Sequence, residues 1–339
     1  MALRMGVLGV GRIGRMHADL LANRIAGTQV QAVFDVVAEA ATDAGSALGV
    51  DVCTSLDDLL ARDDIDAVCV ATSTDTHVDT VVAAAEAGKA IFCEKPVSLD
   101  LSEVDRALAS VDAAGVAFQV GFNRRFDAGH ASVRSTVADK TIGDLHLLRI
   151  TSRDPAPPPI SYVQVSGGIF RDMMIHDFDM ARFVTGSEVI EVFARGAVRV
   201  DPAIGEAGDL DTAVVVMTHA DGTITTIDNS RQAVYGYDQR VEAFGSGGMA
   251  TSENLLEHAG TVATAEGVRS RSLQHFFIER YSASYISQWE AFVEAVTSGT
   301  AVPVTGVDGR APLLIAEACL TSLAEGRAVT VATDASSAI

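Results

Sequence analysis

The chain has 339 residues, 48% of them hydrophobic, and its 45 Asp and Glu against 25 Lys and Arg give a formal net charge of −20 at pH 7. This length is sufficient for two domains, each with its own core. So negative a surface repels phosphate backbones, which argues against nucleic acid and anionic membranes as partners.

The first predicted element is an apolar strand that runs directly into a glycine-rich turn. Residues 5–14 read MGVLGVGRIG, so that Gly9, Gly11 and Gly14 have the spacing G-x-G-x-x-G before a helix-compatible run over residues 13–23. Gly9 allows a tight turn, Gly11 lets the backbone approach a pyrophosphate, and Gly14 lets the helix pack closely on the strand. The phosphates would lie on free amides at the helix N-terminus. The alternative is a glycine-rich turn without a ligand.

Asp35 extends this pattern to a complete dinucleotide site. It ends a predicted second strand over residues 29–34 and stands 21 residues after Gly14. A carboxylate at this place accepts hydrogen bonds from the adenosine ribose and repels a 2′-phosphate, so the predicted cofactor is NAD rather than NADP.

Two further features predict a cytoplasmic protein. The N-terminal apolar run meets glycines too soon to be a signal peptide, and no apolar run reaches membrane-spanning length. The cysteines are widely spaced, form no CxxC pair and mostly lie in apolar runs, which predicts reduced core thiols and no metal site. They are Cys53, Cys69, Cys93 and Cys319.

Strand and helix alternate as far as about residue 121. Strands are predicted over 67–71, 90–93 and 117–121, and helices over 37–48, 76–87 and 102–114, with a short helix opened by Ser55. This rhythm predicts a parallel sheet covered by helices, in which ligands bind beyond the carboxyl ends of the strands. The predicted NAD site comprises Gly9, Gly11, Arg12, Ile13, Gly14, Asp35, Thr72, Ser73, His77, Glu94 and Lys95.

From about residue 145 the pattern becomes β-rich. Strands are predicted over 145–152, 190–199, 212–218, 223–229 and 240–244, and turn pairs such as Asp221-Gly222 favour antiparallel neighbours. The predicted fold class is therefore α/β. It consists of a doubly wound Rossmann domain over residues 1–122 and an α+β domain over 123–339 with a large, open, mostly antiparallel sheet. Helices over 285–296 and 312–325 are predicted near the end, returning to the first domain, and the tail after Thr333 is predicted to be disordered.

Between the strands of this second domain, residues 168–179 read GIFRDMMIHDFD, which suits a half-buried helix. Asp172 and His176 stand four residues apart and would share one helix face. A histidine with a neighbouring carboxylate can serve as an acid or base near neutral pH. The alternative is a partly exposed histidine paired with a surface aspartate.

These motifs together resemble the glucose-fructose oxidoreductase and inositol dehydrogenase family. The resemblance to the family rests on the glycine motif, Glu94-Lys95-Pro96, the stretch GFNRRF over 121–126, and Asp172 with His176. Two further stretches, YGYD over 235–238 and FFIERY over 276–281, resemble the inositol 2-dehydrogenase branch of this family. It implies that Lys95, Asp172 and His176 are catalytic and that Asn123, Arg124, Asp154 and Tyr237 lie on the substrate side. Asn123 stands where other inositol enzymes often carry methionine, and Asp154 where asparagine occurs, so the preferred isomer stays open.

The chemistry follows from the residue types. Oxidising a ring hydroxyl requires a hydride to leave for the nicotinamide and a proton to leave for a base. Neutral His176 could take the proton, with Asp172 stabilising the imidazolium, and Lys95 could stabilise the developing alkoxide. The alternative for Lys95 is a surface lysine before a proline. At least one of Arg124 and Arg125 is expected to tie the domains together by an ion pair. For Tyr235, Tyr281 and Tyr285, packing and hydroxyl contacts both stay open.

The predicted function is NAD-dependent oxidation of a cyclic polyol, above all of myo-inositol to 2-keto-myo-inositol. Alternatives are another inositol isomer or a pyranose sugar, a non-catalytic NAD-binding regulator, and an enzyme that keeps its cofactor through a closed cycle. The predicted partners are a small polyol and further copies of this chain, which form a homodimer or homotetramer through the open sheet.

Overall fold

The structure is a computed structural model that describes residues 2–332, so the predicted disordered tail after Thr333 lies outside the described residues. The chain divides into two compact units. The first contains Met1–Phe122 and Tyr285–Ala311, and the second contains Asn123–Ser284 and Pro312–Ile339. The sequence analysis placed residues 123–339 in the second domain and expected the helices over 285–296 and 312–325 to return to the first. The structure assigns residues 285–311 to the first unit, whereas the helix predicted over 312–325 belongs to the second.

A parallel six-stranded sheet forms the core of the first unit. Its strands run β3-β2-β1-β4-β5-β6 across the sheet. They are β1 (Leu3–Leu8), β2 (Thr28–Phe34), β3 (Asp51–Val52), β4 (Ala67–Val70), β5 (Ala90–Cys93) and β6 (Phe118–Val120). Strand β4 is buried along its whole length, because a parallel sheet covered on both faces leaves no polar side. The predicted doubly wound sheet is confirmed.

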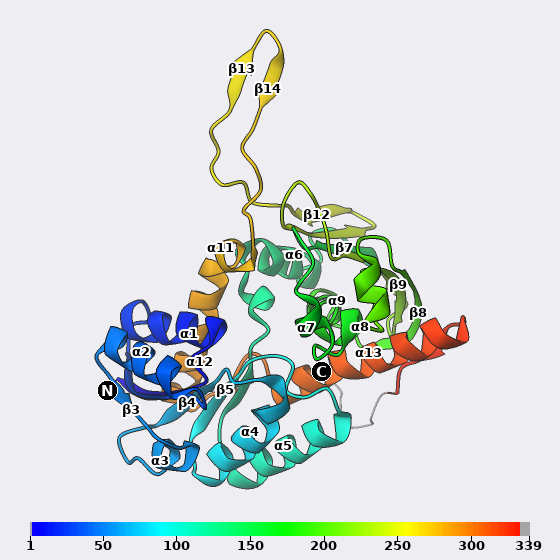
Figure 1. Cartoon of the computed structure of the whole chain (residues 1–339). Coiled ribbons are helices and arrows are strands. Elements are labelled where there is room, and N and C mark those ends of the chain that lie inside the picture. The colour runs from blue at the N-terminus through cyan, green and yellow to red at the C-terminus, as the bar shows by residue number, and fades with distance from the viewer. Residues whose placement is uncertain (1, 333–339) are drawn as a thin grey trace. The chain divides into compact units, whose positions relative to one another are not determined.

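Helices cover both faces of this sheet. They are α1 (Arg12–Asn23), α2 (Ala38–Leu48), α3 (Leu56–Leu60), α4 (His77–Glu86), α5 (Leu101–Ala114) and α12 (Ser282–Ser298), whose first three residues belong to the second unit. Figure 1 shows α1 and α2 on one face and α4 and α5 on the other. The predicted start of α3 is confirmed, because the Ser55 hydroxyl accepts a hydrogen bond from the Asp58 amide at 3.0 Å.

A seven-stranded sheet forms the frame of the second unit, in the order β12-β11-β7-β10-β9-β8-β15. Its strands are β7 (Leu145–Arg153), β8 (Val189–Ala197), β9 (Thr212–His219), β10 (Ile224–Ser230), β11 (Asp238–Gly245), β12 (Gly248–Ser252) and β15 (Val329–Thr330). Strands β7 and β10 pair in parallel, and the other neighbours pair antiparallel. The predicted open, mostly antiparallel sheet is therefore confirmed.

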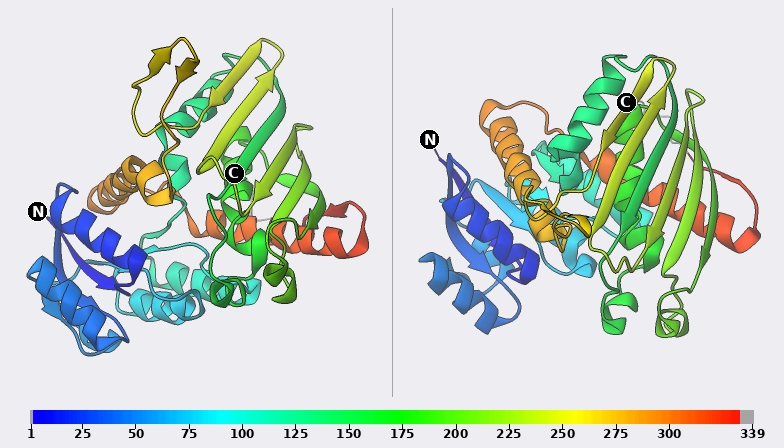
Figure 2. Two further views of the ribbon diagram at one scale, coloured as in Figure 1. Left: turned by 45° about the horizontal axis from the view of Figure 1, so that its top comes forward. Right: turned by 90° about the horizontal axis from the view of Figure 1, so that it is seen from above.

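One face of this sheet packs against helices to make the core of the second unit. These helices are α6 (Ala128–Ala138), α8 (Gly168–Asp172), α9 (Ile175–Thr185) and α13 (Gly306–Glu325), the last of which begins in the first unit. Alternate residues of the strands point to this core, so that on β9 Val215 and Met217 are buried while Val214 and Val216 are exposed. Figure 2 shows the opposite face of the sheet turned away from the helices.

Shorter elements complete the described chain. They are η1 (Thr74–Thr76), η2 (Asn123–Phe126), α7 (Ile160–Val163), α10 (Pro202–Glu206), α11 (Phe277–Arg280) and a hairpin of β13 (Val262–Thr264) and β14 (Gly267–Arg269). Figure 1 shows the hairpin as an arm that extends from the second unit, and every residue from 255 to 272 is exposed. The sequence analysis missed this arm, because its strands of three residues carry too little alternation to stand out.

The structure shows where the four cysteines lie. All four cysteines are free thiols; Cys69, Cys93 and Cys319 are buried and Cys53 is half-buried. Among residues 2–332, no helix has the length and apolarity that a bilayer crossing requires. Within the same residues, no three His, Cys, Asp or Glu side chains form a group that could hold a metal ion.

Candidate active site

The glycine turn between β1 and α1 shows why each glycine is needed. Gly9 has a φ of +85°, and a Cβ there would lie 2.6 Å from the Ala71 carbonyl oxygen. A Cβ on Gly14 would lie 1.9 Å from the Gly9 carbonyl oxygen, so the helix could not pack against the turn. A Cβ on Gly11 would meet nothing within 4 Å. The fold itself thus requires Gly9 and Gly14, whereas the open space at Gly11 fits the close approach of a pyrophosphate.

Asp35 stands directly after β2 and is already oriented by the backbone. Its Oδ2 accepts a hydrogen bond from the Val10 amide at 2.7 Å, and its Oδ1 accepts one from the Val37 amide at 2.8 Å. Each carboxylate oxygen has a further lone pair. Asp35 can therefore hold the glycine turn and still accept hydrogen bonds from ribose hydroxyls.

His77 joins the two loops that follow β4 and β5. Its Nδ1 lies 2.9 Å from the Pro96 carbonyl oxygen, and its Nε2 lies 3.2 Å from the Thr72 carbonyl oxygen. Burial lowers the pKa of His77. The ring is predicted from sequence to bind the cofactor. The structure shows that its two nitrogens face backbone carbonyls, so the ring connects the loop at Thr72 to the Lys95-Pro96 loop.

His17 and Trp289, which the sequence analysis missed, hold Glu94 through a chain of hydrogen bonds. The Trp289 Nε1–H donates to His17 Nδ1 at 2.9 Å, and His17 Nε2 lies 2.7 Å from Glu94 Oε1. Because an indole only donates, His17 must accept at Nδ1 and donate from Nε2 to the carboxylate. The other carboxylate oxygen accepts from the Lys95 amide at 3.3 Å. This buried relay fixes the turn that carries Lys95.

In the second unit, Asp172 and His176 do not share a helix. Asp172 is the last residue of α8, and α9 begins at Ile175, with Met173 and Met174 between them. The predicted continuous helix is therefore wrong: Met173 and Met174, at 5% and 0% exposure, form a turn between α8 and α9. An apolar pattern alone does not distinguish such a break from a continuous helix. Asp172 and His176 are both half-buried.

Two side chains hold the Asp172 carboxylate. The Tyr162 hydroxyl donates to Oδ1 at 2.8 Å, and Arg231 Nη1 lies 3.4 Å from Oδ2. Tyr162 comes from α7, and Arg231 follows β10 directly. Neither residue carried a sequence motif, so only the fold could identify them.

Arg124 is part of a buried network in the same unit. Its Nη1 donates to Asp177 Oδ1 at 2.8 Å, and the Asn229 amide donates to Asp177 Oδ2 at 2.7 Å. Burial raises the pKa of Asp177 although the Arg124 guanidinium opposes this. Arg125 forms a bidentate pair with Asp179 on α9. Both pairs connect η2 to α9 within one unit, where the sequence analysis expected an ion pair between domains.

The other predicted substrate residues lie near this network. Asn123 is 3% exposed, and its Nδ2 has no hydrogen-bond partner among residues 2–332. Tyr237 is buried, with its ring edge-on to Tyr281. Asp154 follows β7, and burial raises its pKa to about 6 against the opposing charges of Arg124 and Arg231. The structure thus brings Arg124, Asp154, Asp172 and Asp177 into one electrostatic group.

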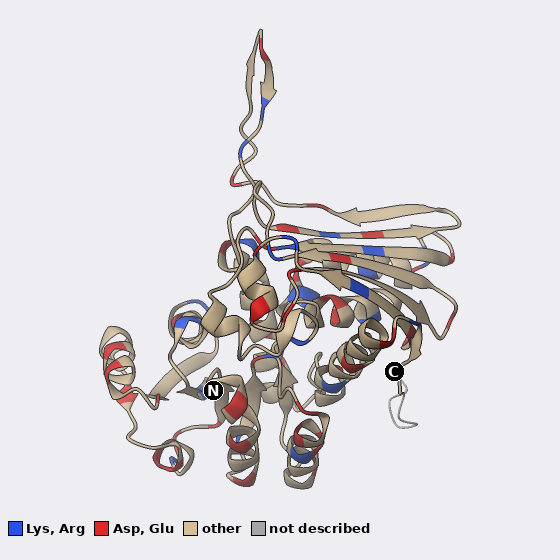
Figure 3. Ribbon diagram, turned by 45° about the vertical axis from the view of Figure 1, so that its right-hand side comes forward, with Lys and Arg blue, Asp and Glu red and all other residues tan. Residues whose placement is uncertain are grey.

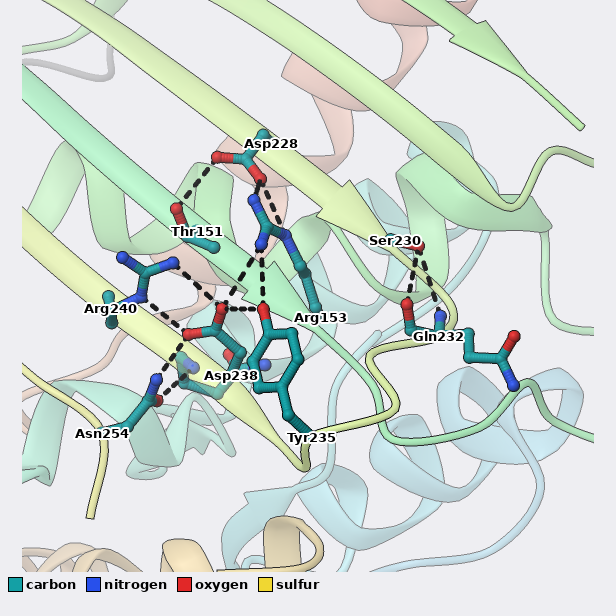
Figure 4. A network of polar contacts seen from close by, with 10 residues as sticks. Thr151, Arg153, Asp228, Ser230, Gln232, Tyr235, Asp238, Arg240 and Asn254 are labelled. Carbon is teal, nitrogen blue, oxygen red and sulfur yellow. Dashed lines mark hydrogen bonds and ion pairs between the residues drawn. The ribbon is translucent and has the colours of Figure 1, made fainter. Parts of the chain in front are cut away.

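Tyr235 belongs to a different network, on the open face of the sheet (Figure 4). Its hydroxyl donates to Asp238 Oδ2 at 2.6 Å and accepts from Arg153 Nη1 at 2.9 Å. Arg153 also pairs with Asp228, and Asp238 accepts from Arg240 Nε at 2.7 Å. Tyr235 therefore makes hydroxyl contacts that crosslink β7 and β11, and its neighbour in the motif, Tyr237, points to a separate environment.

Comparison with known proteins identifies the family. Residues 3–122 match the model of the "Oxidoreductase family, NAD-binding Rossmann fold", and residues 130–251 match the "GFO/IDH/MocA C-terminal domain". The chain belongs to the GFO/IDH/MocA oxidoreductase family. The resemblance seen in the sequence is confirmed, and so is NAD as the cofactor of this oxidoreductase.

Relatives of the GFO/IDH/MocA family match this chain over nearly its whole length. A myo-inositol 2-dehydrogenase of Thermotoga maritima is 47% identical over 96% of this chain and 98% of its own, and an inositol 2-dehydrogenase of Rhizobium meliloti is 45% identical over 98% and 100%. The crystal structure of a probable dehydrogenase from Thermotoga maritima aligns with a TM-score of 0.95 at 47% identity, covering 97% of this chain and 99% of that one. A scyllo-inositol dehydrogenase from Lactobacillus casei, with bound NAD(H) and scyllo-inositol, aligns with a TM-score of 0.92 at 32% identity, covering 98% and 100%.

Proposed function

We propose that this oxidoreductase oxidises a cyclic polyol with NAD and that its main reaction converts myo-inositol to 2-keto-myo-inositol. The observation that carries this proposal is the identity of 45% to 47%, over almost the full chain, to relatives named for inositol 2-dehydrogenase activity. The buried carboxylates and arginines of the second unit support it, since hydroxyl groups are well bound by such donors and acceptors.

The second unit supplies the proton acceptor in this proposal. Bound NAD accepts the hydride from the carbinol carbon at its nicotinamide ring. Neutral His176 takes the hydroxyl proton as the carbon–oxygen double bond forms, and Asp172 stabilises the imidazolium. The products are a ketone, NADH and one proton, which His176 later returns to water.

Lys95 supplies the positive charge in the proposed mechanism. Its ammonium donates to the carbinol oxygen and stabilises the alkoxide character that develops as the proton leaves. The relay from Trp289 through His17 to Glu94 fixes the backbone from which Lys95 extends. Positioning by buried groups of this kind is what holds a catalytic side chain in its productive geometry.

The decisive experiment is a substrate panel. Purified protein with NAD is given myo-inositol, scyllo-inositol, chiro-inositols, glucose or xylose, and NADH is followed by absorbance. We expect NADH to accumulate fastest with myo-inositol. A fastest rate with scyllo-inositol would instead assign that isomer as the main substrate. No NADH with any polyol would reject the proposal and favour a regulator or an enzyme with a closed cofactor cycle.

We also propose that a second copy of this chain covers the open sheet face of the second unit. Apolar side chains are exposed there on neighbouring strands: Leu147 at 48%, Val214 at 47%, Ile224 at 41% and Phe244 at 45%. A row of this kind is normally buried against a two-fold mate. Light scattering at micromolar concentration should give a dimeric or tetrameric mass. Replacing Val214 and Ile224 with lysine should lower that mass, and a parent protein of monomeric mass would contradict the proposal.

A further inference from the structure

Arg231 contacts the end of the short helix α8 directly and is connected to its start through Asp209. Its Nη1 lies 3.4 Å from Oδ2 of Asp172, the last residue of the helix. Its Nη2 donates to Asp209 Oδ2 at 3.1 Å, and Asp209 Oδ1 in turn accepts from the Ile169 amide in the first turn at 2.9 Å. One guanidinium therefore connects the two carboxylates that mark the start and the end of α8.

This arrangement depends on residues of particular shape. The Arg231 side chain is only 2% exposed, and its backbone amide donates to the Asp211 carbonyl oxygen at 2.8 Å, so the guanidinium starts from a fixed point. Gly168 has a φ of +82°, and a Cβ there would lie 2.8 Å from Asp209 Oδ1. The close approach of Asp209 to the helix therefore requires glycine at this position.

The helix α8 also borders a cavity. Gly168, Ile169 and Phe170 line a cavity of about 300 Å³, together with Asp209. Asp172 also stands at a helix C-terminus, where the backbone carbonyls disfavour a negative charge. The buried Arg231 guanidinium beside its carboxylate compensates for this repulsion.

We propose that Arg231, with Asp209, is a positioning residue that fixes the Asp172 carboxylate for the reaction. This inference rests on the proposed function, because it assumes that Asp172 acts on His176. Arginine is required because its planar fork reaches two carboxylates at once, whereas a lysine ammonium is a single point charge that would follow one of them. Arg231 touches neither substrate nor cofactor in this role and acts only through Asp172.

The first test compares two conservative variants of equally buried arginines. Arg231→Lys should lower kcat by about 10- to 100-fold and leave the KM for the polyol and the Kd for NAD within about threefold of the parent. The matched control is Arg182→Lys. Arg182 lies in α9, its side chain is also 2% exposed, and it pairs with Glu188 at 2.6 Å. Both variants should lose thermal stability, and only Arg231→Lys should lose turnover. Equal loss of kcat in both would overturn the proposal.

The second test asks whether Arg231 acts through Asp172. In an Asp172→Asn background, Arg231→Lys should lower the melting temperature as before but should change kcat by less than about twofold, because residues that act as one unit are not additive. Additive losses of kcat would assign Arg231 a separate role and overturn the proposal. If Asp172→Asn alone left kcat unchanged, the proposed function of Asp172 would fail instead, so the two failures are distinguishable.

A milder variant covers the case in which Arg231→Lys does not fold. Asp209→Asn keeps an oxygen for the Ile169 amide but removes the charge that holds Nη2 of Arg231. We expect kcat to fall about three- to tenfold, again with little further effect in the Asp172→Asn background. A folded Asp209→Asn variant with the kcat of the parent would contradict the inference.

Discussion

The two units of this oxidoreductase place their charges in different environments. In the first unit, the arginine ion pairs are partly or largely exposed: Arg4 and Asp66 are 39% and 37% exposed, and Arg106 and Asp79 are 44% and 78% exposed. The second unit has exposed pairs too, such as Lys140 and Asp144 at 74% and 78%, but it also buries arginine pairs such as Arg125 and Asp179 at 10% and 1%. Figure 3 shows charges of both signs along the strands of the second unit.

Exposed and buried ion pairs contribute differently to the stability of the two units. Exposed ion pairs contribute about 0 to 1 kcal/mol, because water screens them. Removing one partner of a buried pair costs about 3 to 5 kcal/mol, because the other charge stays buried without compensation. The first unit therefore depends on its apolar parallel sheet and glycine turn, and the second depends also on polar contacts between distant segments.

The largest expected effect would show that both units contribute to turnover. Lys95→Ala in the first unit and His176→Ala in the second should each lower kcat by about 10² to 10⁴, because each removes a group that acts on the transferring proton or the alkoxide. NAD binding, measured by isothermal titration, should stay nearly unchanged in both. A His176→Ala variant with near-normal kcat on every polyol that the parent oxidises would leave the half-buried histidine without a catalytic role.

The second prediction tests the contrast between the ion pairs directly. Arg125→Met leaves Asp179 buried without its bidentate partner and should lower the free energy of unfolding by about 3 to 5 kcal/mol. Arg106→Met, at the exposed pair of the first unit, should lower it by less than about 1 kcal/mol. Denaturant unfolding monitored by circular dichroism measures both. Equal losses would remove the distinction between the units.

The third prediction concerns the cofactor side of the first unit. Asp35→Ser should weaken NAD binding by about 2 to 3 kcal/mol, through the loss of ribose hydrogen bonds, and should relieve the repulsion of NADP. Because Asp35 also accepts from the amides of Val10 and Val37, a small loss of thermal stability should accompany this change. Steady-state kinetics with both cofactors provide the measurement. A parent enzyme that used NADP as well as NAD would contradict the role of Asp35.

The smallest expected effect is a pH dependence in the second unit. Burial raises the pKa of Asp154 to about 6 from an ordinary value of 3.8. The ionised carboxylate therefore lowers the stability of the folded state above pH 6. This loss disappears as the pH falls below 3.8, where the carboxyl group is protonated in both the folded and the unfolded state. Asp154→Asn should therefore raise stability by about 1 kcal/mol at pH 7.5, after allowance for screening. In thermal unfolding, the gain should shrink between pH 6 and pH 4. A gain that was constant with pH would exclude the titration of Asp154.

Much of the first unit could be predicted because its determinants are local. The glycine spacing, the acid at the end of β2 and the alternation of strands and helices each lie within a few dozen residues, and the fold, the family and NAD are confirmed. The catalytic and substrate residues stay predictions. His17 and Trp289 could not be paired in advance, because they are 272 residues apart in the chain.

The second unit shows more clearly what local patterns leave out. The apolar run around Met173 and Met174 predicted one helix, whereas the structure has a turn at these two buried methionines, between α8 and α9. The link from Asp209 through Arg231 to Asp172 joins three segments through charges that look ordinary in sequence. Such contacts follow from the register of the sheet, and no short motif encodes them.

Trp289 is an intrinsic fluorescence probe of the first unit. It is the only tryptophan among the 339 residues, it is fully buried, and its ring centroid lies 4.2 Å from that of Phe92 in the first unit. Its emission should therefore move to longer wavelength when the first unit unfolds and should not respond when the second unit unfolds by itself. Fluorescence and circular dichroism recorded on one sample would then reveal the order in which the units melt.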